Sequence, residues 1–376
     1  MLLVMTKGQA DEIPMNTGIL VTGGAGFIGS NFVLDWIGGG MGRVVTVDAL
    51  TYASNRGNLA SVEGNPDHVF VHGNICDGEL IADILAEHRP RAIIHFAAES
   101  HVDRSIAVPD AFLKTNIDGT FTLLQAARVY IATLNEEDRK NFRFVHVSTD
   151  EVYGTLEPED PAFSETTPYA PNSPYAASKA ASDFLARAWL HTYNLPVLIT
   201  NCSNNYGPYQ FPEKLIPLII THALTGKALP IYGDGLQVRD WLFVSDHCKA
   251  IVEVLERGVV GETYNIGGNN QRSNLEVVHT ICSLLDEFVP DSPYKPHNQL
   301  ITYVKDRPGH DRRYAIDARK IERELAWRPE ESFETGMRKT IEWYLSNDQW
   351  VQSVTGAAYQ QWVATNYAGR KTEKVV

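Results

Sequence analysis

The alternation of short apolar segments with helical patterns constrains the fold of this chain more than any other feature of its sequence. Within residues 18–200, six apolar runs have the length of buried strands, and helical patterns lie between several of them. Strands that alternate with helices build βαβ units around a parallel sheet that is buried on both faces. The sequence therefore predicts an α/β fold with a doubly wound parallel sheet. The expected strands cover residues 18–22, 44–48, 69–71, 92–96, 142–148 and 197–200.

The pattern becomes irregular after Asn201, where prolines and aromatic residues cluster. We interpret this part as a smaller mixed α/β domain for substrate, from which segments near residues 240–265 return to the large sheet. The predicted division is a flexible N-terminal extension over 1–16, a sheet domain over 17–203, and a substrate domain that comprises most of 204–376. The expected long helices cover residues 27–37, 79–88, 112–130, 175–193, 212–225, 246–257, 274–288 and 333–346.

Charge and cysteine content exclude several classes of partner. The chain has 33 Lys and Arg against 46 Asp and Glu, a net charge of −13. An acidic surface of this size argues against a general nucleic-acid or anionic-membrane partner. No apolar run reaches the roughly 18–20 residues of a membrane helix, and the four cysteines form no CxxC pair. We therefore expect a cytoplasmic protein without a nucleic-acid partner, membrane association or metal site.

A glycine-rich turn follows the first predicted strand and opens a helix. Gly23, Gly26 and Gly29 give the spacing GxxGxxG, which lets the backbone approach a pyrophosphate at the helix N-terminus. Asp48 lies 48 − 29 = 19 residues after the last glycine, close to the roughly 20-residue spacing of a carboxylate on an adenosine ribose. Ala49 follows it, so no arginine there attracts the 2′-phosphate of NADP. The motif predicts a Rossmann-type site for NAD.

A tyrosine and a lysine share one face of the helix expected at 175–193. Tyr175 and Lys179 are four residues apart, which places the phenol beside the ammonium. We expect Lys179 to lower the phenol pKa, so that Tyr175 serves as a base on a sugar hydroxyl. Taken alone, the same spacing is also common among surface pairs. Thr149, at the end of the fifth strand, lies at the sheet edge where ligands bind and can hydrogen-bond the same oxygen.

Two adjacent carboxyls, Asp150 and Glu151, follow Thr149 directly. Oxidation of an alcohol needs only a base and a hydride acceptor, so two further carboxyls offer additional chemistry. If their environments separate the two pKa values, one can donate a proton while the other accepts one, which is what removal of water requires. From the residues alone, they could also be two solvated acids in a turn.

Taken together, these motifs resemble the extended short-chain dehydrogenase/reductases, and more narrowly the dTDP-glucose 4,6-dehydratase family of sugar-nucleotide dehydratases. The resemblance spans about residues 17–370. The resemblance implies that Tyr175 with Lys179 deprotonates the glucose 4-hydroxyl as hydride leaves C4, that Glu151 removes the C5 proton, and that Asp150 protonates the departing C6 hydroxyl. The segments that carry it are residues 22–30, 48–53, 95–104, 148–154, 175–179, 203–218, 232–244, 264–268 and 306–317.

The resemblance also implies the residues of two binding sites and a homodimer. The NAD site comprises the three glycines with Phe27, Ile28, Asp48, Ala49, Leu50, Thr51, Asn74, Ile75, Phe96, Ala97, Ala98, Glu99, Thr115, Tyr175, Lys179 and Asn205. The dTDP-glucose site comprises Ser100, Thr149, Glu151, Asn204, Lys214, Leu215, Pro230, Tyr232, Arg239, Asn274, Arg307 and His310. Asn74 and Ala49 depart from the family's usual Asp and Lys, which we expect to change cofactor affinity modestly.

Three alternatives differ from this reading. A UDP-hexose 4-epimerase would use NAD, Tyr175 and Lys179 but would have no use for Asp150 and Glu151. A 4,6-dehydratase for a UDP-, CDP- or GDP-linked hexose would need all of them, and the base pocket does not follow from one sequence. A non-catalytic NAD-binding scaffold would not need all four of these side chains intact.

Overall fold

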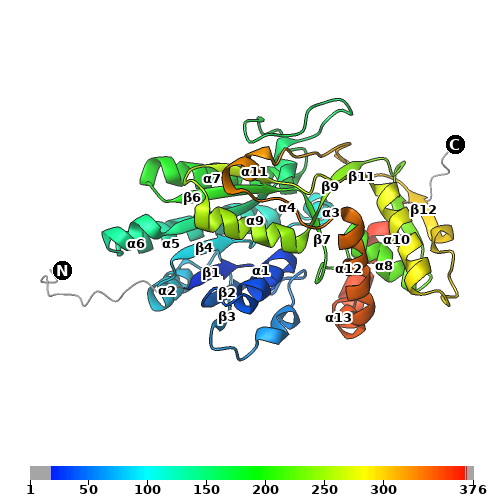
Figure 1. The fold of residues 1–376 in the computed structure, drawn as a ribbon, viewed down its shortest axis with the longest axis horizontal. Helices are drawn as coiled ribbons and strands as arrows, with labels where there is room; N and C mark the ends of the chain where they lie inside the picture. Colours follow the sequence, from blue (N-terminus) through cyan, green and yellow to red (C-terminus); the bar gives the residue numbers. More distant parts are fainter. Residues whose placement is uncertain (1–17, 369, 371–376) are drawn as a thin grey trace, which may run out of the picture.

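The computed structural model of the chain describes residues 18–368 and 370, and the extension expected over 1–16 lies outside them. A seven-stranded parallel sheet forms the centre of the larger part, in the order β10-β6-β5-β4-β1-β2-β3 (Figure 1). The α/β prediction is confirmed, and six strands lie where the sequence predicted them. The strands are β1 (Ile19–Thr22), β2 (Val44–Asp48), β3 (His68–His72), β4 (Ala92–His95), β5 (Arg143–Thr149), β6 (Val197–Cys202) and β10 (Thr263–Ile266).

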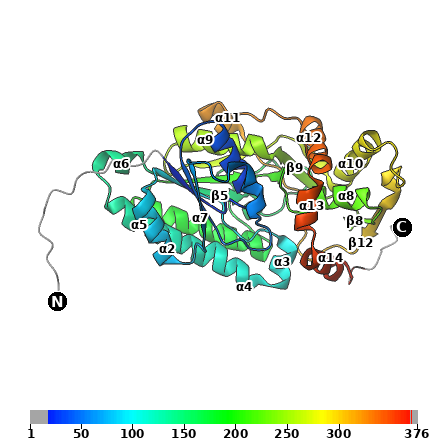
Figure 2. The same cartoon turned by 90° about the horizontal axis from the view of Figure 1, so that it is seen from below.

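Helices cover both faces of this sheet. Figure 2 shows α1 (Phe27–Gly38), α9 (Val244–Arg257) and α11 (Arg319–Leu325) on one side. The other side carries α2 (Gly78–His88), α5 (Thr120–Ala132) and α7 (Pro174–Tyr193), next to the short α6 (Glu136–Asn141). Each layer has its own apolar core, and the side chains of both cores are almost completely buried. The strands are apolar throughout because both faces of the sheet are covered.

The smaller part has a separate apolar core between short strands and helices. One sheet joins β11 (Gln271–Ser273), β9 (Val238–Phe243) and β7 (Asn204–Tyr206), and a second joins β12 (Ile301–Val304) to β8 (Leu229–Tyr232). The helices are α8 (Leu215–Leu224), α10 (Asn274–Phe288), α12 (Phe333–Ser346), α13 (Asp348–Val354) and α14 (Ala357–Ala368), with a turn η4 (His297–Leu300). Because β9 leads directly into α9, the chain returns from this part to the large sheet. Among the described residues, no helix combines the length and apolar character needed to cross a membrane.

Helix α7 begins directly before Tyr175, and this start places Tyr175 beside the edge of the sheet. The Ser173 side chain accepts a hydrogen bond from the Ala176 amide at 3.1 Å, and Pro174 occupies the first helical position. Both features favour a helix start, since serine satisfies a free amide and proline has none to lose. The helix ends at Asn194, which adopts a left-handed conformation with φ 54°. Tyr175 therefore lies in the first turn, close to the end of β5.

The single helix expected at 112–130 is interrupted. The chain forms α3 (Val102–Ala107), α4 (Pro109–Phe112) and a π-helical turn η2 (Leu113–Gly119) before α5. Within this turn, the Asn116 side chain exchanges hydrogen bonds of 2.9 and 3.0 Å with the backbone of Glu99 and donates to Ser178 at 2.9 Å. These tertiary contacts fix the wider turn, which no local pattern predicts. Two 3-10 segments, η1 (Arg56–Val62) and η3 (Asp150–Tyr153), follow β2 and β5.

Candidate active site

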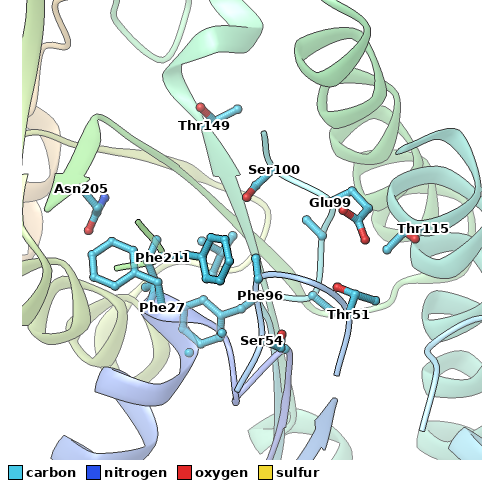
Figure 3. Close-up of a pocket in the computed structure, with 18 of the residues that line it drawn as sticks. Phe27, Thr51, Ser54, Phe96, Glu99, Ser100, Thr115, Thr149, Asn205 and Phe211 are labelled. Atoms are coloured by element: carbon cyan, nitrogen blue, oxygen red, sulfur yellow. The ribbon is translucent and has the colours of Figure 1, made fainter. Parts of the chain in front are cut away.

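Two connected cavities open at the carboxyl ends of the strands, where ligands bind in open α/β sheets. The first extends from the glycine turn to the end of β5. In Figure 3 its side chains surround one space, with Thr149 and Ser54 on opposite sides. The second lies between α3 and the smaller part of the molecule. The residues shared by both linings are Glu151, Asn204, Asn205, Gln210, Glu213 and Lys214.

The glycine turn forms a cradle that side chains would fill. Gly23 has φ +72°, and a Cβ there would lie 2.6 Å from the Ala97 amide nitrogen. A Cβ on Gly29 would collide with the Gly23 carbonyl oxygen. Gly26 precedes α1 without a side-chain cap, so the first amides of this helix are free to face a ligand. This geometry fits a dinucleotide pyrophosphate.

Asp48 supports the same turn from the end of β2. Its carboxylate accepts hydrogen bonds from the Ala25 amide at 2.9 Å and the Leu50 amide at 2.8 Å. Each oxygen keeps a second lone pair that can accept a ribose hydroxyl. Asp48 therefore links the glycine turn to the loop after β2.

Tyr175 and Lys179 both line the first cavity. The Lys179 ammonium donates to the Val147 carbonyl at 2.9 Å. The expectation that Lys179 lowers the phenol pKa is not met, because burial and the negative charge of Glu151 raise the pKa of Tyr175 well above its usual value. A hydrogen bond with Thr149 acts in the opposite direction. Burial also lowers the pKa of Lys179, so desolvation dominates both groups.

Asp150 and Glu151 occupy different environments. Asp150 is 1% exposed, and its Oδ2 has no hydrogen-bond partner among the described residues. Burial raises its pKa well above the usual value, and the charges of Glu151 and Asp240 add to this. Burial also raises the pKa of Glu151, but Arg307, Lys214 and Arg239 oppose the increase. The pair thus contains one carboxyl that favours its protonated form and one that faces positive charge.

Basic side chains converge on the second cavity. Arg239 is 5% exposed and donates to the Asp311 carbonyl at 2.9 Å. Arg307 has its Nε 3.7 Å from an Asp103 carboxylate oxygen, while its buried Nη1 has no partner among the described residues. Lys214 donates to the Ser100 carbonyl at 2.8 Å. These cations supply a local positive field in an acidic protein, as binding of a diphosphate requires.

Nearly all residues proposed from the sequence line one of the two cavities. The exception is Leu50, which has φ 50° and contributes its amide to Asp48 rather than its side chain to the cavity. Among the aromatic residues near the site, Phe211 lines the first cavity and Trp241 the second, whereas Tyr206 belongs to the apolar core. Cys202 lines the first cavity, and burial raises its thiol pKa, so it has no nucleophilic character.

Several lining residues were missed by sequence reasoning. Asp103 stands inside the segment of residues 95–104 that carried the resemblance, and Glu213 precedes Lys214, so both had a local signal. Tyr367 comes from the distant α14 and had none. The missed residues are Val47, Tyr52, Ala53, Ser54, Gly73, Val147, Ser148, Ser203, Gln210 and Glu213 in the first cavity, and His101, Val102, Asp103, Ile216, Leu218, Ile231, Tyr314 and Tyr367 in the second.

The histidines near the sheet are held by hydrogen bonds. His95 lies between the hydroxyls of Thr22 at 2.7 Å and Thr120 at 3.0 Å, and His146 lies 3.0 Å from the Asp183 carboxylate. Burial lowers the pKa of His101 to about 4, which leaves it neutral at pH 7. Within residues 18–368 and 370, no three His, Cys, Asp or Glu side chains are grouped so that they could hold a metal ion.

Over most of its length, the chain is similar to known proteins named dTDP-glucose 4,6-dehydratase. The family model described as GDP-mannose 4,6-dehydratase matches residues 20–340. A relative from Xanthomonas campestris pv. campestris (strain B100), named dTDP-glucose 4,6-dehydratase, is 63% identical over 91% of this chain and 97% of its own length. The solved structure of a dTDP-glucose 4,6-dehydratase from Streptomyces venezuelae, with NAD bound, is 48% identical with a TM-score of 0.81, and the match covers 90% of this chain and 99% of that one.

Similarity of fold alone does not distinguish a dehydratase from an epimerase. A UDP-glucose 4-epimerase from Thermotoga maritima also aligns, with a TM-score of 0.76 and 30% identity over 88% of this chain and 99% of that one. The higher identity to the dehydratases, over almost their full length, distinguishes the two groups. This chain therefore belongs to the dTDP-glucose 4,6-dehydratases, within the wider family described as GDP-mannose 4,6-dehydratase.

Proposed function

We propose that the protein is an NAD-dependent dTDP-glucose 4,6-dehydratase that forms dTDP-4-keto-6-deoxyglucose. The observation that carries this proposal is the difference in the charges around Asp150 and Glu151, which line the first cavity together with Tyr175. An epimerase has no use for an acid and a base at this place. Bound NAD⁺ would accept the hydride from C4 and return it to C6, so the cofactor ends each cycle oxidised.

The protein side chains would move the protons. Tyr175 takes the proton of the 4-hydroxyl as a phenolate, a form that the Lys179 ammonium would favour against the effect of burial, and Thr149 hydrogen-bonds the oxygen. Glu151 then removes the proton from C5, which the neighbouring C4 ketone has made acidic. Asp150 gives its proton to the C6 hydroxyl, which leaves as water. C5 then regains a proton. At the end of the cycle Tyr175 holds one proton more and Asp150 one proton fewer than at the start, so the two changes cancel.

The arrangement of the cavities supports the proposal that one part of the chain binds the cofactor and another part binds the substrate. Apart from Leu50, the residues proposed for NAD line the first cavity. Of those proposed for the sugar nucleotide, Ser100 and Thr149 line the first cavity, Glu151, Asn204 and Lys214 line both, and the others line the second. We accordingly assign residues 17–203, with the returning segment near 240–265, to the cofactor, and most of 204–376 to the substrate. Lys214, Arg239 and Arg307 would bind the diphosphate, with His310 beside them.

A homodimer and a cytoplasmic location complete the proposal. Large apolar side chains are exposed on α5 and α7, where Phe121 is 44%, Val129 62% and Phe184 58% exposed. Exposed large apolar side chains of this kind are typical of an interface, and a second copy of the chain would cover them. The four cysteines are free thiols, as expected in a reducing compartment.

Comparison of nucleotide sugars tests the substrate assignment. The purified protein is incubated with dTDP-, UDP-, CDP- and GDP-glucose at equal concentration, and the 4-keto-6-deoxy product is quantified by nuclear magnetic resonance. We expect kcat/KM for dTDP-glucose to be at least about ten times that for each of the other three substrates. This ratio corresponds to about 1.4 kcal/mol of transition-state stabilisation. Preferential conversion of UDP-glucose, or formation of a C4 epimer, would contradict the assignment.

A further inference from the structure

Arg104 on α3 is enclosed between two aromatic rings that come from distant parts of the chain. Its guanidinium carbon lies 3.7 Å from the ring centre of Tyr52 and 4.1 Å from that of Trp362. Its Nε donates to the Glu213 carboxylate at 2.9 Å, and the Glu213 side chain is 2% exposed. Stacking on two rings and pairing with a buried carboxylate fix this guanidinium in one orientation.

The stack joins the wall of the first cavity to the C-terminal helix. Tyr52 belongs to the loop at residues 49–55, which lines the first cavity beside the glycine turn, and Trp362 belongs to α14. The same aromatic cluster continues through Phe211, whose ring is 6.0 Å from Tyr52 and 6.0 Å from Tyr359. Figure 2 shows α14 beside α3, in agreement with these contacts.

Helix α13 holds the same region at a second point. The Trp350 indole donates to the Asn58 side chain at 2.7 Å, and the Asn58 amide donates to the Ala25 carbonyl at 2.9 Å. Ala25 lies inside the glycine turn. Two consecutive hydrogen bonds therefore connect α13 through Asn58 to the pyrophosphate cradle.

From these contacts we propose that Arg104, with α13 and α14, forms a clasp that slows the release of NAD. This inference rests on the proposed use of NAD. The glycine turn and the loop at 49–55 both line the first cavity. A dinucleotide bound there would lie between them, and its departure would require the loop to move. Movement of the loop would break the stack of Tyr52 on Arg104, and movement of the adjoining η1 would break the hydrogen bond of Asn58 with Trp350 on α13. Because the cofactor is oxidised again in every cycle, slow release is compatible with fast turnover.

The test measures the dissociation of NAD. Purified protein loaded with isotope-labelled NAD is mixed with an excess of unlabelled NAD, and the loss of label is followed over time. We expect Trp362→Leu to release NAD about tenfold faster than the wild type, since one cation–π face is lost. Trp362→Phe retains a ring and should lie near the wild type. Gln361→Ala, an exposed neighbour on the same helix, is the matched control.

The outcomes separate the clasp from the proposed function. If the wild type converts dTDP-glucose but Trp362→Leu releases NAD no faster, the clasp is wrong and the function stands. A wild type that holds no NAD overturns both. If Trp362→Leu does not fold, Trp350→Phe serves instead, because it keeps an aromatic ring, removes the hydrogen bond to Asn58 and should still accelerate release. Unchanged release in that variant overturns the clasp.

Discussion

Asp150 and Glu151 are consecutive residues, and burial raises the pKa of both carboxyl groups, yet different charged groups surround them. Asp150 is buried beside Asp240 with one oxygen unpaired among the described residues, whereas Glu151 faces the charges of Arg307, Lys214 and Arg239. Different environments are what allow two carboxyls to act as acid and base at one pH. This contrast is the basis of the proposed removal of water.

Glu151→Gln should stop water loss without loss of NAD binding. The amide keeps the size of the side chain but cannot accept the C5 proton, so product formation should fall by about 10²–10⁴-fold. Oxidation at C4 should persist, and the absorbance of the reduced cofactor should accumulate in a single turnover. The exposed Glu157→Gln is the control. Near-normal product formation by Glu151→Gln would remove Glu151 from the mechanism.

The acidic limb of the pH profile should move when Lys214 is neutralised. Glu151 acts as a base only when ionised, so kcat falls as the pH drops through its pKa. Burial raises that pKa and Lys214 lowers it, so Lys214→Met should raise it and move the acidic limb of kcat to higher pH. The measurement is kcat at saturating substrate across pH, with the exposed Lys227→Met as control. An unchanged limb would show that Glu151 does not control it.

Gly29→Ala should damage the cofactor cradle. The added Cβ would meet the Gly23 carbonyl, and overpacking of this kind costs about 1–3 kcal/mol. We expect a lower free energy of unfolding in urea and NAD affinity reduced at least about tenfold, or about 1.4 kcal/mol. Gly38→Ala, in the same helix, is the control because its Cβ would meet nothing within 4 Å. Equal behaviour of the two variants would contradict the close packing at Gly29.

Asp183 should be a major determinant of stability. Its buried carboxylate accepts hydrogen bonds from Ser148 and Tyr169, both at 2.9 Å, and lies 3.0 Å from His146. Removal of the carboxylate leaves these buried groups unpaired, so Asp183→Ala should lower the free energy of unfolding by about 3 kcal/mol or more. Urea unfolding measures the difference from the exposed Asp83→Ala. A change below about 1 kcal/mol would mean that the hydrogen bonds are readily replaced by water.

The sequence could predict what depends on local pattern and on the topology of a parallel sheet. Strand β5 and helix α7 were located within a residue or two, and their junction brings Thr149 and Tyr175 to one sheet edge. The sequence could not predict the π-helical turn at Asn116, because hydrogen bonds to residues distant in sequence fix this turn. The raised pKa of Tyr175 also depends on burial, which only the folded structure supplies.

The contribution of α14 to the site could not be predicted from the sequence either. Tyr367 lines the second cavity, and Trp362 stacks on Arg104, although both are more than 200 residues from the glycine turn in sequence. Helix α14 has no local motif that connects it with a ligand. Its contribution follows only from tertiary contacts, such as the hydrogen bond of 3.1 Å from Asn366 to the Tyr232 hydroxyl.

The most direct test of the central claim is the mass spectrum of dTDP-glucose after incubation with the purified protein, without added cofactor. The account predicts loss of the mass of one water, with NAD supplied by the protein itself. An unchanged mass in the presence of added NAD⁺ would contradict the proposed dehydration of dTDP-glucose.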